Sequence, residues 1–324
     1  MIKKKLKVAL IYGGKSAEHD VSIQSARNVA DALDKKKYEV IPFKIARNGN
    51  FFIDEIKSKR IDVVFPVLHG PYGEDGSIQG LFKVSGIPFV GAGVLGSAVG
   101  MDKDIMKKLF REAKIPIGKF ITVRNGETFS FKEISKKLGL PMFIKPANLG
   151  SSVGIHKIKN EKEFKKGLAD AFKYDSKVII EENINCREIE CSVLGNENPI
   201  ASIPGEIIAN ADFYSYESKY IDNKSVCEIP AKLPQKTRKE IQNMAVKAFK
   251  VLNCEGMGRV DFFLKKNGEI LVNEINTIPG FTSISMYPKL WEASGLPISK
   301  LLDRLIELAI LRYKKEQKFK TSIK

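Results

Sequence analysis

The residues best suited to chemistry are two acids, Asp261 and Glu274, which a predicted β-hairpin brings face to face. Two runs of strand-forming residues flank Asn267-Gly268, a dipeptide typical of two-residue hairpin turns. Such a turn pairs Lys266 with Glu269, and counting outward places Asp261 opposite Glu274. Opposed carboxylates about 5 Å apart repel each other, so this arrangement needs a cation between them. The pattern therefore predicts a cation site on the hairpin.

The same count places Arg259 opposite Asn276, on the face that carries the two acids, because side chains alternate along a strand. Asp, Glu and Asn offer only hard oxygen ligands, which suit Mg²⁺ better than zinc or copper. The guanidinium adds an anion-binding group. The alternative is that Arg259 forms a purely structural ion-pair cluster with the acids. The segment 277–283, rich in hydroxyl and backbone N–H groups, favours a functional site.

The composition predicts a globular cytoplasmic protein. A chain of 324 residues with 43% hydrophobic residues has room for two or three domains. The four cysteines show neither metal-ligand spacing nor a dense disulfide framework, which fits a reducing compartment. The apolar run near the start is too short for a signal peptide, and no run approaches the ~20 apolar residues of a membrane span.

The formal net charge of +16 allows three interpretations. The chain could bind nucleic acid, bind a small anionic substrate such as a nucleotide, or simply carry a lysine-rich surface. The lysines are scattered in short groups and are not interleaved with aromatic residues in one patch. This distribution favours the plain surface first, phosphate ligands second and nucleic acid last.

The first third of the chain has the pattern of a parallel α/β sheet. The expected elements are strands 5–11, 38–45, 61–68 and 87–90, a helix over 21–33, a short helix around 78–82, and a helix from 97 to about 113. Glu18-His19 and His69-Gly70 follow two of these strands, where α/β sheets bind ligands. The glycine turn lacks the dinucleotide fingerprint, so a Rossmann cofactor is not expected.

From residue 141 the pattern changes to strand, small-residue loop and strand, over 142–146, 147–154 and 155–158. Such a loop can approach a phosphate closely, and Lys145 precedes it, although a loop that binds nothing would look similar. The remaining expected elements are a capped helix from Asn160, strands 178–182 and 187–194, an aromatic-rich irregular loop over 204–230 that is typical of a lid, and helices 235–252 and 299–313.

Eight motifs in order give the chain a specific resemblance. They are Gly13-Gly-Lys-Ser-Ala-Glu-His-Asp-Val-Ser22, Leu68-His-Gly70, Met101-Asp-Lys103, Ile144-Lys-Pro146, Gly150-Ser-Ser-Val-Gly154, Phe213-Tyr-Ser-Tyr-Glu-Ser-Lys-Tyr220, Gly258-Arg-Val-Asp261 and Asn273-Glu-Ile-Asn-Thr277. Over nearly its whole length the chain resembles D-alanine–D-alanine ligases of the ATP-grasp superfamily. The resemblance implies an α/β fold, α+β in its ATP-binding part, with three domains: a parallel-sheet domain over 1–93, a central domain over 94–184 and a catalytic domain over 185–324.

The resemblance also implies the reaction. ATP would phosphorylate the carboxylate of one D-alanine, and the amine of a second would attack the acyl phosphate, giving D-alanyl-D-alanine for peptidoglycan precursors. Two Mg²⁺ ions, which Mn²⁺ could replace, would bridge the ATP phosphates and be held by Asp261, Glu274 and Asn276. The family implies a cytoplasmic homodimer that acts on small molecules, without a nucleic-acid or membrane partner.

For ATP, the resemblance assigns the phosphates to Lys103 and Lys145 under a loop that includes Gly150, Ser151 and Ser152. It assigns the adenine to Glu181 and the Ile184 backbone, and the ribose to Glu188. It further places at the ATP site Glu182, Lys219, Phe263 and Asn273.

For the amino acids, the resemblance assigns the first D-alanine to Glu18, which would bind its ammonium, and to His69, near its carboxylate. Arg259 and the Gly280 N–H would stabilise the oxyanion. The second D-alanine would meet Ser285 and Met286. Lys219 would reach the transferred phosphate, and Tyr220 would close the lid with Ser151 and Glu18. A tyrosine at position 220 favours an amine nucleophile; a D-alanine–D-lactate ligase or another ATP-grasp carboxylate–amine ligase is the alternative.

Overall fold

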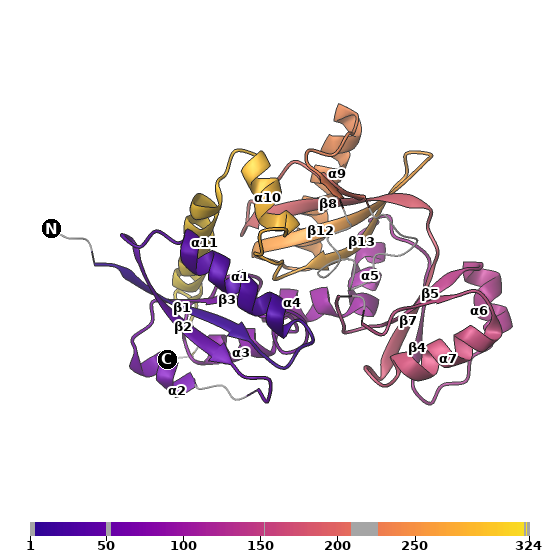
Figure 1. The fold of residues 1–324 in the computed structure, drawn as a ribbon, viewed down its shortest axis with the longest axis horizontal. Helices are drawn as coiled ribbons and strands as arrows, with labels where there is room; N and C mark the ends of the chain where they lie inside the picture. The colour runs from indigo at the N-terminus through magenta and orange to yellow at the C-terminus, as the bar shows by residue number, and fades with distance from the viewer. Residues whose placement is uncertain (1–3, 50–52, 152, 209–225, 321, 323–324) are drawn as a thin grey trace.

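The computed structural model describes residues 4–49, 53–151, 153–208, 226–320 and 322. Its described strands form three sheets, which lie side by side along the long axis of the molecule (Figure 1). The first sheet is parallel and the other two are antiparallel, so the predicted mixed α/β fold is confirmed. Within these ranges no helix has the length and apolar character needed to cross a bilayer.

The first sheet has the strand order β2-β1-β3. Its Val/Ile/Leu-rich strands are buried on both faces, with α1 on one side and α2 and α3 on the other. The predicted strand 87–90 is wrong, because this segment makes only an isolated bridge between Phe89 and Val64. The elements are β1 (Leu6–Gly13), α1 (His19–Ala32), β2 (Tyr38–Ile45), α2 (Ile53–Ser58), β3 (Val63–Pro66) and α3 (Ser77–Val84).

The single helix predicted from residue 97 to 113 is in fact two, α4 (Val94–Met101) and α5 (Lys103–Glu112). Asp102 breaks the helix with an extended backbone (ψ 98°), and its side chain caps α5 by accepting from the N–H groups of Asp104 and Ile105, each at 3.1 Å. The break makes Lys103 the first residue of α5. Its N–H donates to the carbonyl of Ala147 at 3.0 Å, which ties the start of α5 to the second sheet.

The second sheet, with the order β4-β7-β5-β6, has its own apolar core against α6 and α7. The predicted strand–loop–strand is confirmed as β5 and β6, and the predicted capped helix as α7. The chain enters and leaves this sheet at one place: the Lys119 N–H donates to the Glu182 carboxylate at 2.7 Å, and the Glu182 N–H to the Lys119 carbonyl at 3.1 Å. The elements are β4 (Phe120–Arg124), α6 (Phe131–Leu138), β5 (Met142–Pro146), β6 (His156–Ile158), α7 (Glu161–Ala171) and β7 (Lys177–Glu182).

The third sheet has the order β11-β10-β8-β12-β13, with β9 paired to β8. α9 and the apolar side of α5 cover one face. The predicted irregular loop over 204–230 is wrong at its ends, which form β10 and β11; residues 209–225 lie outside the described ranges. The elements are β8 (Cys186–Gly195), β9 (Ile200–Ala201), β10 (Gly205–Ile208), β11 (Val226–Glu228), α9 (Gln235–Val251), β12 (Gly256–Lys265), β13 (Ile270–Asn276), α10 (Met286–Ala293) and α11 (Ile298–Glu316).

The turn between β12 and β13 differs from the prediction. The Lys265 N–H donates to the carbonyl of Glu269 at 2.9 Å, and the Gly268 N–H donates to the carbonyl of Lys265 at 2.9 Å. The loop therefore holds three residues, with Gly268 in the left-handed region at φ 85°. The predicted two-residue turn, with Lys266 opposite Glu269, is wrong.

A β-bulge corrects the register further along the hairpin. Asp261 pairs with Glu274, but the next residue of β12 pairs with Val272, so Asn273 is the extra residue. The bulge interrupts the alternation of β13, and the neighbours Asn273 and Glu274 are both half-buried. The predicted Asp261–Glu274 pair is therefore confirmed. The three-residue turn shifts the register by one residue, and the bulge at Asn273 shifts it back.

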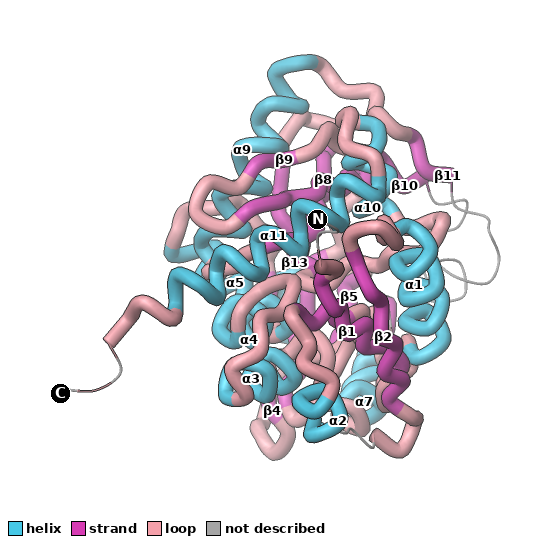
Figure 2. The backbone as a smooth tube through the Cα atoms, turned by 90° about the vertical axis from the view of Figure 1, so that its left-hand side faces the viewer, coloured by secondary structure: helices cyan, strands magenta, loops and turns pink. Residues whose placement is uncertain are grey.

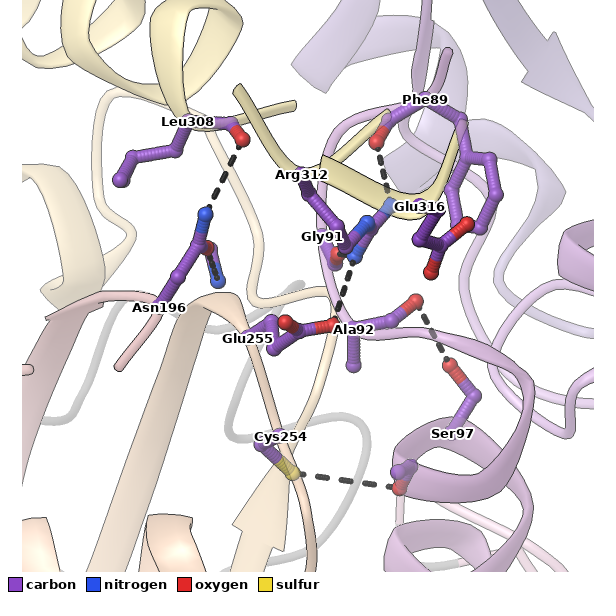
Figure 3. Close-up of polar contacts among 12 residues, drawn as sticks. Phe89, Gly91, Ala92, Ser97, Asn196, Cys254, Glu255, Leu308, Arg312 and Glu316 are labelled. Carbon is purple, nitrogen blue, oxygen red and sulfur yellow. Dashed lines mark hydrogen bonds and ion pairs between the residues drawn. The ribbon is translucent and has the colours of Figure 1, made fainter. Parts of the chain in front are cut away.

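The last helix, α11, joins the first and third sheets. It contacts β3 in the first and β8 and β12 in the third, and Figures 1 and 2 both place it against the N-terminal strands. Near its end Arg312, only 7% exposed, donates to the carbonyls of Phe89 at 2.7 Å and Gly91 at 2.6 Å, and lies 3.5 Å from Glu255 (Figure 3). Because one apolar core mixes residues from both ends of the chain, the first and third sheets form one packed body.

Candidate active site

A cleft of about 650 Å³ lies between the second and third sheets. It is lined by β5, β7, β8, β12 and β13 and by the loop after β5. Every described residue that the sequence assigned to ATP lines it; these are Lys103, Lys145, Gly150, Ser151, Glu181, Glu182, Ile184, Glu188, Phe263 and Asn273. Ser152 and Lys219 lie outside the described residues. The structure thus gathers the predicted nucleotide residues, from distant parts of the chain, around one cavity.

Helix α5 places Lys103 in the lining of this cleft and Lys107 behind it, one turn apart on the same helix face. Lys103 donates to the carbonyl of Leu149 at 2.7 Å and lies 3.4 Å from the Glu274 carboxylate. Lys107, only 3% exposed, lies 2.7 Å from the carboxylate of Glu181. Sequence reasoning missed Lys107; its spacing of four residues from Lys103 was the signal that could have found it.

Glu181 lies between two cations. Its second oxygen is 2.6 Å from the ammonium of Lys145, so each carboxylate oxygen has a lysine beside it. Burial alone would raise the pKa of Glu181, but the charges of Lys107 and Lys145 outweigh it and lower that pKa to about 2. For Lys145, burial lowers the pKa, but Glu181 and Glu274 outweigh this effect and raise it. Glu181 and Lys145 are therefore both charged at neutral pH.

A smaller cavity of about 60 Å³ adjoins the cleft, and Gly150, Ser151 and Glu274 line both. The Ser151 hydroxyl donates to the Glu18 carboxylate, which joins the loop after β5 to the start of α1. Ser151 adopts a left-handed backbone, φ 51°, which is uncommon for a residue other than glycine and is often found at functional sites. Tyr220, the expected third member of this network, lies outside the described residues.

The small cavity also holds the predicted groups of the third sheet and of the loop after β3. Glu18, His69, Arg259 and Gly280 line it together. Of the two residues expected for the second amino acid, Ser285 lies next to Gly280 and its hydroxyl accepts from the Thr282 N–H at 3.0 Å. Met286 is buried against Ile207 and Leu290, so its side chain is not brought to the cavity.

Arg259 is held from two sides. Both oxygens of Asp261 accept from its guanidinium, at 2.7 and 2.8 Å, and Glu190 lies 2.9 Å away. Arg259 pairs with Asn276 across the hairpin, as predicted, and the Asn276 amide donates to Asp261 at 3.0 Å. The structural ion-pair cluster considered above is thus present in part: Arg259 pairs with Asp261 and with Glu190, which the sequence pattern did not reveal, whereas Glu274 lies 3.4 Å from Lys103. Arg259 and Asn276 nevertheless line the cavity.

The donor set suits a hard cation. Glu274 and Asp261 face each other directly, and Asn276 adjoins them, so only oxygen and amide groups are offered. In the described part of the chain no group of three or more His, Cys, Asp or Glu side chains is placed to hold a metal ion. A cation bound here would complete its coordination with substrate oxygens, which is the usual way that proteins hold Mg²⁺.

Glu74 is a second functional candidate that sequence reasoning missed. It lines the small cavity, and its two oxygens accept from the N–H groups of Gly70 at 2.8 Å and Ile278 at 3.0 Å. Burial, helped by the nearby charge of Glu18, raises the pKa of Glu74 to about 8. The available signal was an acid inside a glycine-rich turn that directly follows His69 at the end of a strand.

The two cavities together can support one kind of chemistry. The larger is lined by lysines and a glycine-containing loop, as a site for a polyphosphate needs. The smaller offers a carboxylate, a guanidinium and a backbone N–H around a volume that fits a small amino acid. Because Glu274, Gly150 and Ser151 border both, a group can be transferred directly between their occupants.

Comparisons with known proteins agree with this geometry. Two family models match: "D-ala D-ala ligase N-terminus" over residues 7–60 and 53–92, and "D-ala D-ala ligase C-terminus" over residues 109–307. A D-alanine–D-alanine ligase of Oceanobacillus iheyensis is 48% identical, over 98% of this chain and 99% of its own length. The ligase structure from Coxiella burnetii gives a TM-score of 0.88 at 39% identity, over 98% of this chain and 97% of that one.

Two further solved structures bear on ligands. The D-alanine–D-alanine ligase of Bacillus anthracis complexed with ATP gives a TM-score of 0.83 at 34% identity, over 96% of this chain and 99% of that one. The VanG D-Ala:D-Ser ligase of Enterococcus faecalis gives 0.84 at 38% identity, over 94% and 100%. The fold is therefore shared by ligases whose second amino acids differ. With both family models and full-length relatives in agreement, this chain belongs to the D-alanine–D-alanine ligase family.

Proposed function

We propose that this enzyme uses ATP to join two D-alanines into D-alanyl-D-alanine, a building block of peptidoglycan. The observation that carries the proposal is the shared border of the two cavities, where Gly150, Ser151 and Glu274 adjoin both the cleft and the small pocket. A triphosphate in the cleft and an amino acid in the pocket would meet at this border. Transfer of the terminal phosphoryl group to the D-alanine carboxylate needs little beyond positioning and charge neutralisation.

The charged residues around the border have roles that follow from their places. Lys103 and Lys145 would bind phosphate oxygens, and Glu18 would bind the ammonium of the first D-alanine. When the amine of the second D-alanine attacks the acyl phosphate, negative charge develops on the former carboxylate oxygen. The guanidinium of Arg259 and the N–H of Gly280, both bordering the pocket, would stabilise that charge.

Asp261, Glu274 and Asn276 would hold the Mg²⁺ that accompanies ATP. The support is chemical: they offer hard oxygen donors in one place, with too few protein ligands to complete a coordination shell without phosphates. When bound, Mg²⁺ neutralises phosphate charge as the phosphoryl group moves. Arg259 fixes the direction of the Asp261 carboxylate through the paired hydrogen bonds described above.

We also propose that the segments 1–93, 94–184 and 185–324 act as substrate, nucleotide and catalytic domains, and that the enzyme works as a cytoplasmic homodimer. Sedimentation of the purified protein tests the dimer.

The decisive experiment is ADP formation with D-alanine, compared with L-alanine and with no amino acid. We expect turnover with D-alanine alone, and product analysis should give the dipeptide. Adding D-lactate or D-serine to D-alanine tests the second substrate, because the similarity to a D-Ala:D-Ser ligase makes that site the place where relatives differ. Equal turnover with L-alanine, or ADP formation independent of amino acid, would refute the proposal.

A further inference from the structure

The loop that carries Gly280 belongs to the third sheet, but side chains of the first sheet hold it. The N–H of Ile278 donates to Glu74 at 3.0 Å, and the carbonyl of Ile278 lies 3.0 Å from Nδ1 of His69. Both backbone groups of one loop residue are thus bonded to the turn that follows β3. His69 is buried and Glu74 is half-buried, so these hydrogen bonds are largely shielded from water.

The other end of the loop is held by α1. The N–H of Phe281 donates to the hydroxyl of Ser25 at 3.2 Å, and the amide of Asn28 donates to the carbonyl of Phe281 at 3.0 Å. Ser25 is fully buried. Both backbone groups of Phe281 are therefore fixed as well, from an element of the first sheet. The loop is anchored on each side of Gly280.

These bonds determine which nitrogen of His69 carries the hydrogen. A carbonyl can only accept, so Nδ1 carries the hydrogen that faces Ile278. Burial lowers the pKa of His69, which favours the neutral ring, so Nε2 is an acceptor. The Ser25 hydroxyl, 3.3 Å from Nε2, donates to it and accepts from Phe281. Both ring nitrogens are thus used within the protein, and neither has a hydrogen left for a substrate carboxylate.

Between the two anchored residues, Ile278 and Phe281, one N–H is left for a ligand. Pro279 has none, and those of Ile278 and Phe281 are bonded as above. No described residue accepts a hydrogen bond from the N–H of Gly280, which lies between the two anchors and borders the small cavity. A donor held in place before the reaction stabilises developing charge without a cost of reorganisation.

We infer that His69 is a positioning residue, which together with Ser25, Asn28 and Glu74 aims the Gly280 N–H at the reacting oxygen and does not bind the substrate carboxylate. This inference rests on the proposed function for its consequence in catalysis, but the anchoring can be measured without turnover.

Two substitutions of His69 separate the alternatives. In His69→Asn the amide nitrogen can take the place of Nδ1 and still donate to Ile278, whereas His69→Gln places its amide near Nε2. We expect kcat to fall about tenfold to a hundredfold in His69→Gln, as for a misplaced oxyanion donor, and only about threefold in His69→Asn. The KM for the first D-alanine should stay within about twofold in both. A large rise in that KM in both variants, with kcat unchanged, would overturn the inference.

Hydrogen exchange of the unliganded enzyme tests the anchor itself. Ser25→Ala removes the acceptor of the Phe281 N–H, and we expect that amide to exchange about fivefold to tenfold faster. Arg27→Ala, a nearby substitution on the exposed side of α1, should leave it unchanged. Equal exchange in Ser25→Ala and wild type would overturn the inference even in an active ligase. Faster exchange in a protein that makes no ADP with D-alanine would instead refute the proposed function and leave the anchor standing.

Discussion

Replacing Lys107 with methionine tests whether Lys107 and Lys145 together stabilise the charge of Glu181 beside the nucleotide cleft. Lys107 lies behind the cleft wall, beside the carboxylate of Glu181 and over the ring of Phe120. Lys145 contacts the other carboxylate oxygen and also borders the cleft. If Lys145 moves to a phosphate when ATP binds, Lys107 is the cation that remains beside Glu181. The substitution keeps most of the length and the apolar stem of the side chain and removes its ammonium group.

The pKa of Glu181 sets the size of the effect. Its displacement from 4.5 to about 2 corresponds to about 3 kcal/mol in favour of the charged carboxylate. Two lysines provide this, so losing Lys107 should lower the free energy of unfolding by about 2 kcal/mol, somewhat less than the loss of a sole partner of a buried charge. Lys145 then becomes the only cation for Glu181, and moving it to a phosphate becomes costly. We expect the KM for ATP to rise about tenfold, with kcat changed less.

ADP formation at varied ATP gives the kinetic part of this test, and urea unfolding followed by circular dichroism gives the stability part. Lys108→Met is the matched control. It removes a lysine from the next position of the same helix, where a half-exposed side chain pairs with Asp104 at 2.9 Å and should contribute less than about 1 kcal/mol. A Lys107→Met enzyme with the stability and ATP dependence of wild type would refute the shared-charge reasoning.

Three further outcomes are expected. Glu274→Gln should lower ADP formation at least about a hundredfold, with circular dichroism unchanged, because it neutralises a cation ligand at the site of phosphoryl transfer; near-normal turnover would remove Glu274 from the metal site. In Gly280→Ala the new Cβ would lie 2.7 Å from the Ser285 hydroxyl, so the KM for the second D-alanine should rise several-fold; an unchanged KM would place that substrate elsewhere. Because its pKa is lowered, Glu181 stabilises the fold above pH 4.5 and loses this effect as the pH falls toward 2. Urea unfolding between pH 7 and 3 should therefore show a steeper loss of stability in wild type than in Glu181→Gln, and parallel curves would contradict it.

The sequence pattern predicted the pairing of the two hairpin strands correctly, because that pairing is fixed by which side chains are buried. Asp261 and Glu274 face each other because both hairpin strands must bury their apolar side chains against α9, which fixes their partners over most of the length. The turn itself was predicted wrongly, since Asn267-Gly268 also suits the three-residue loop that is present. The bulge at Asn273 could not be foreseen, because no residue type requires it and its effect is to correct a register that the turn had shifted.

The residues that sequence reasoning missed are those whose surroundings are set by packing against distant parts of the chain. Lys107 and Glu74 resemble ordinary charged residues on a helix and in a turn, and only the packing of α5 and of the turn after β3 buries the first and half-buries the second. The helix break at Asp102 likewise depends on a contact with a distant part of the chain. An aspartate is a good N-cap anywhere, but the break occurs here because the N–H of Lys103 finds the carbonyl of Ala147 on the second sheet.

The crossing of Lys119 and Glu182 gives the second sheet the character of an inserted lobe whose two ends leave the rest of the enzyme at a single point. A tilt of this lobe about that point would break polar contacts, such as the hydrogen bond from the N–H of Lys103 to the carbonyl of Ala147, but it would not open an apolar core, because the core of the lobe is separate. Tilting would change the width of the nucleotide cleft, since the loop with Gly150 and Ser151 travels with the lobe. The pair of Asp261 and Glu274 on the hairpin would stay intact throughout, so the proposed metal site and the access of the nucleotide would be mechanically separable in this chain.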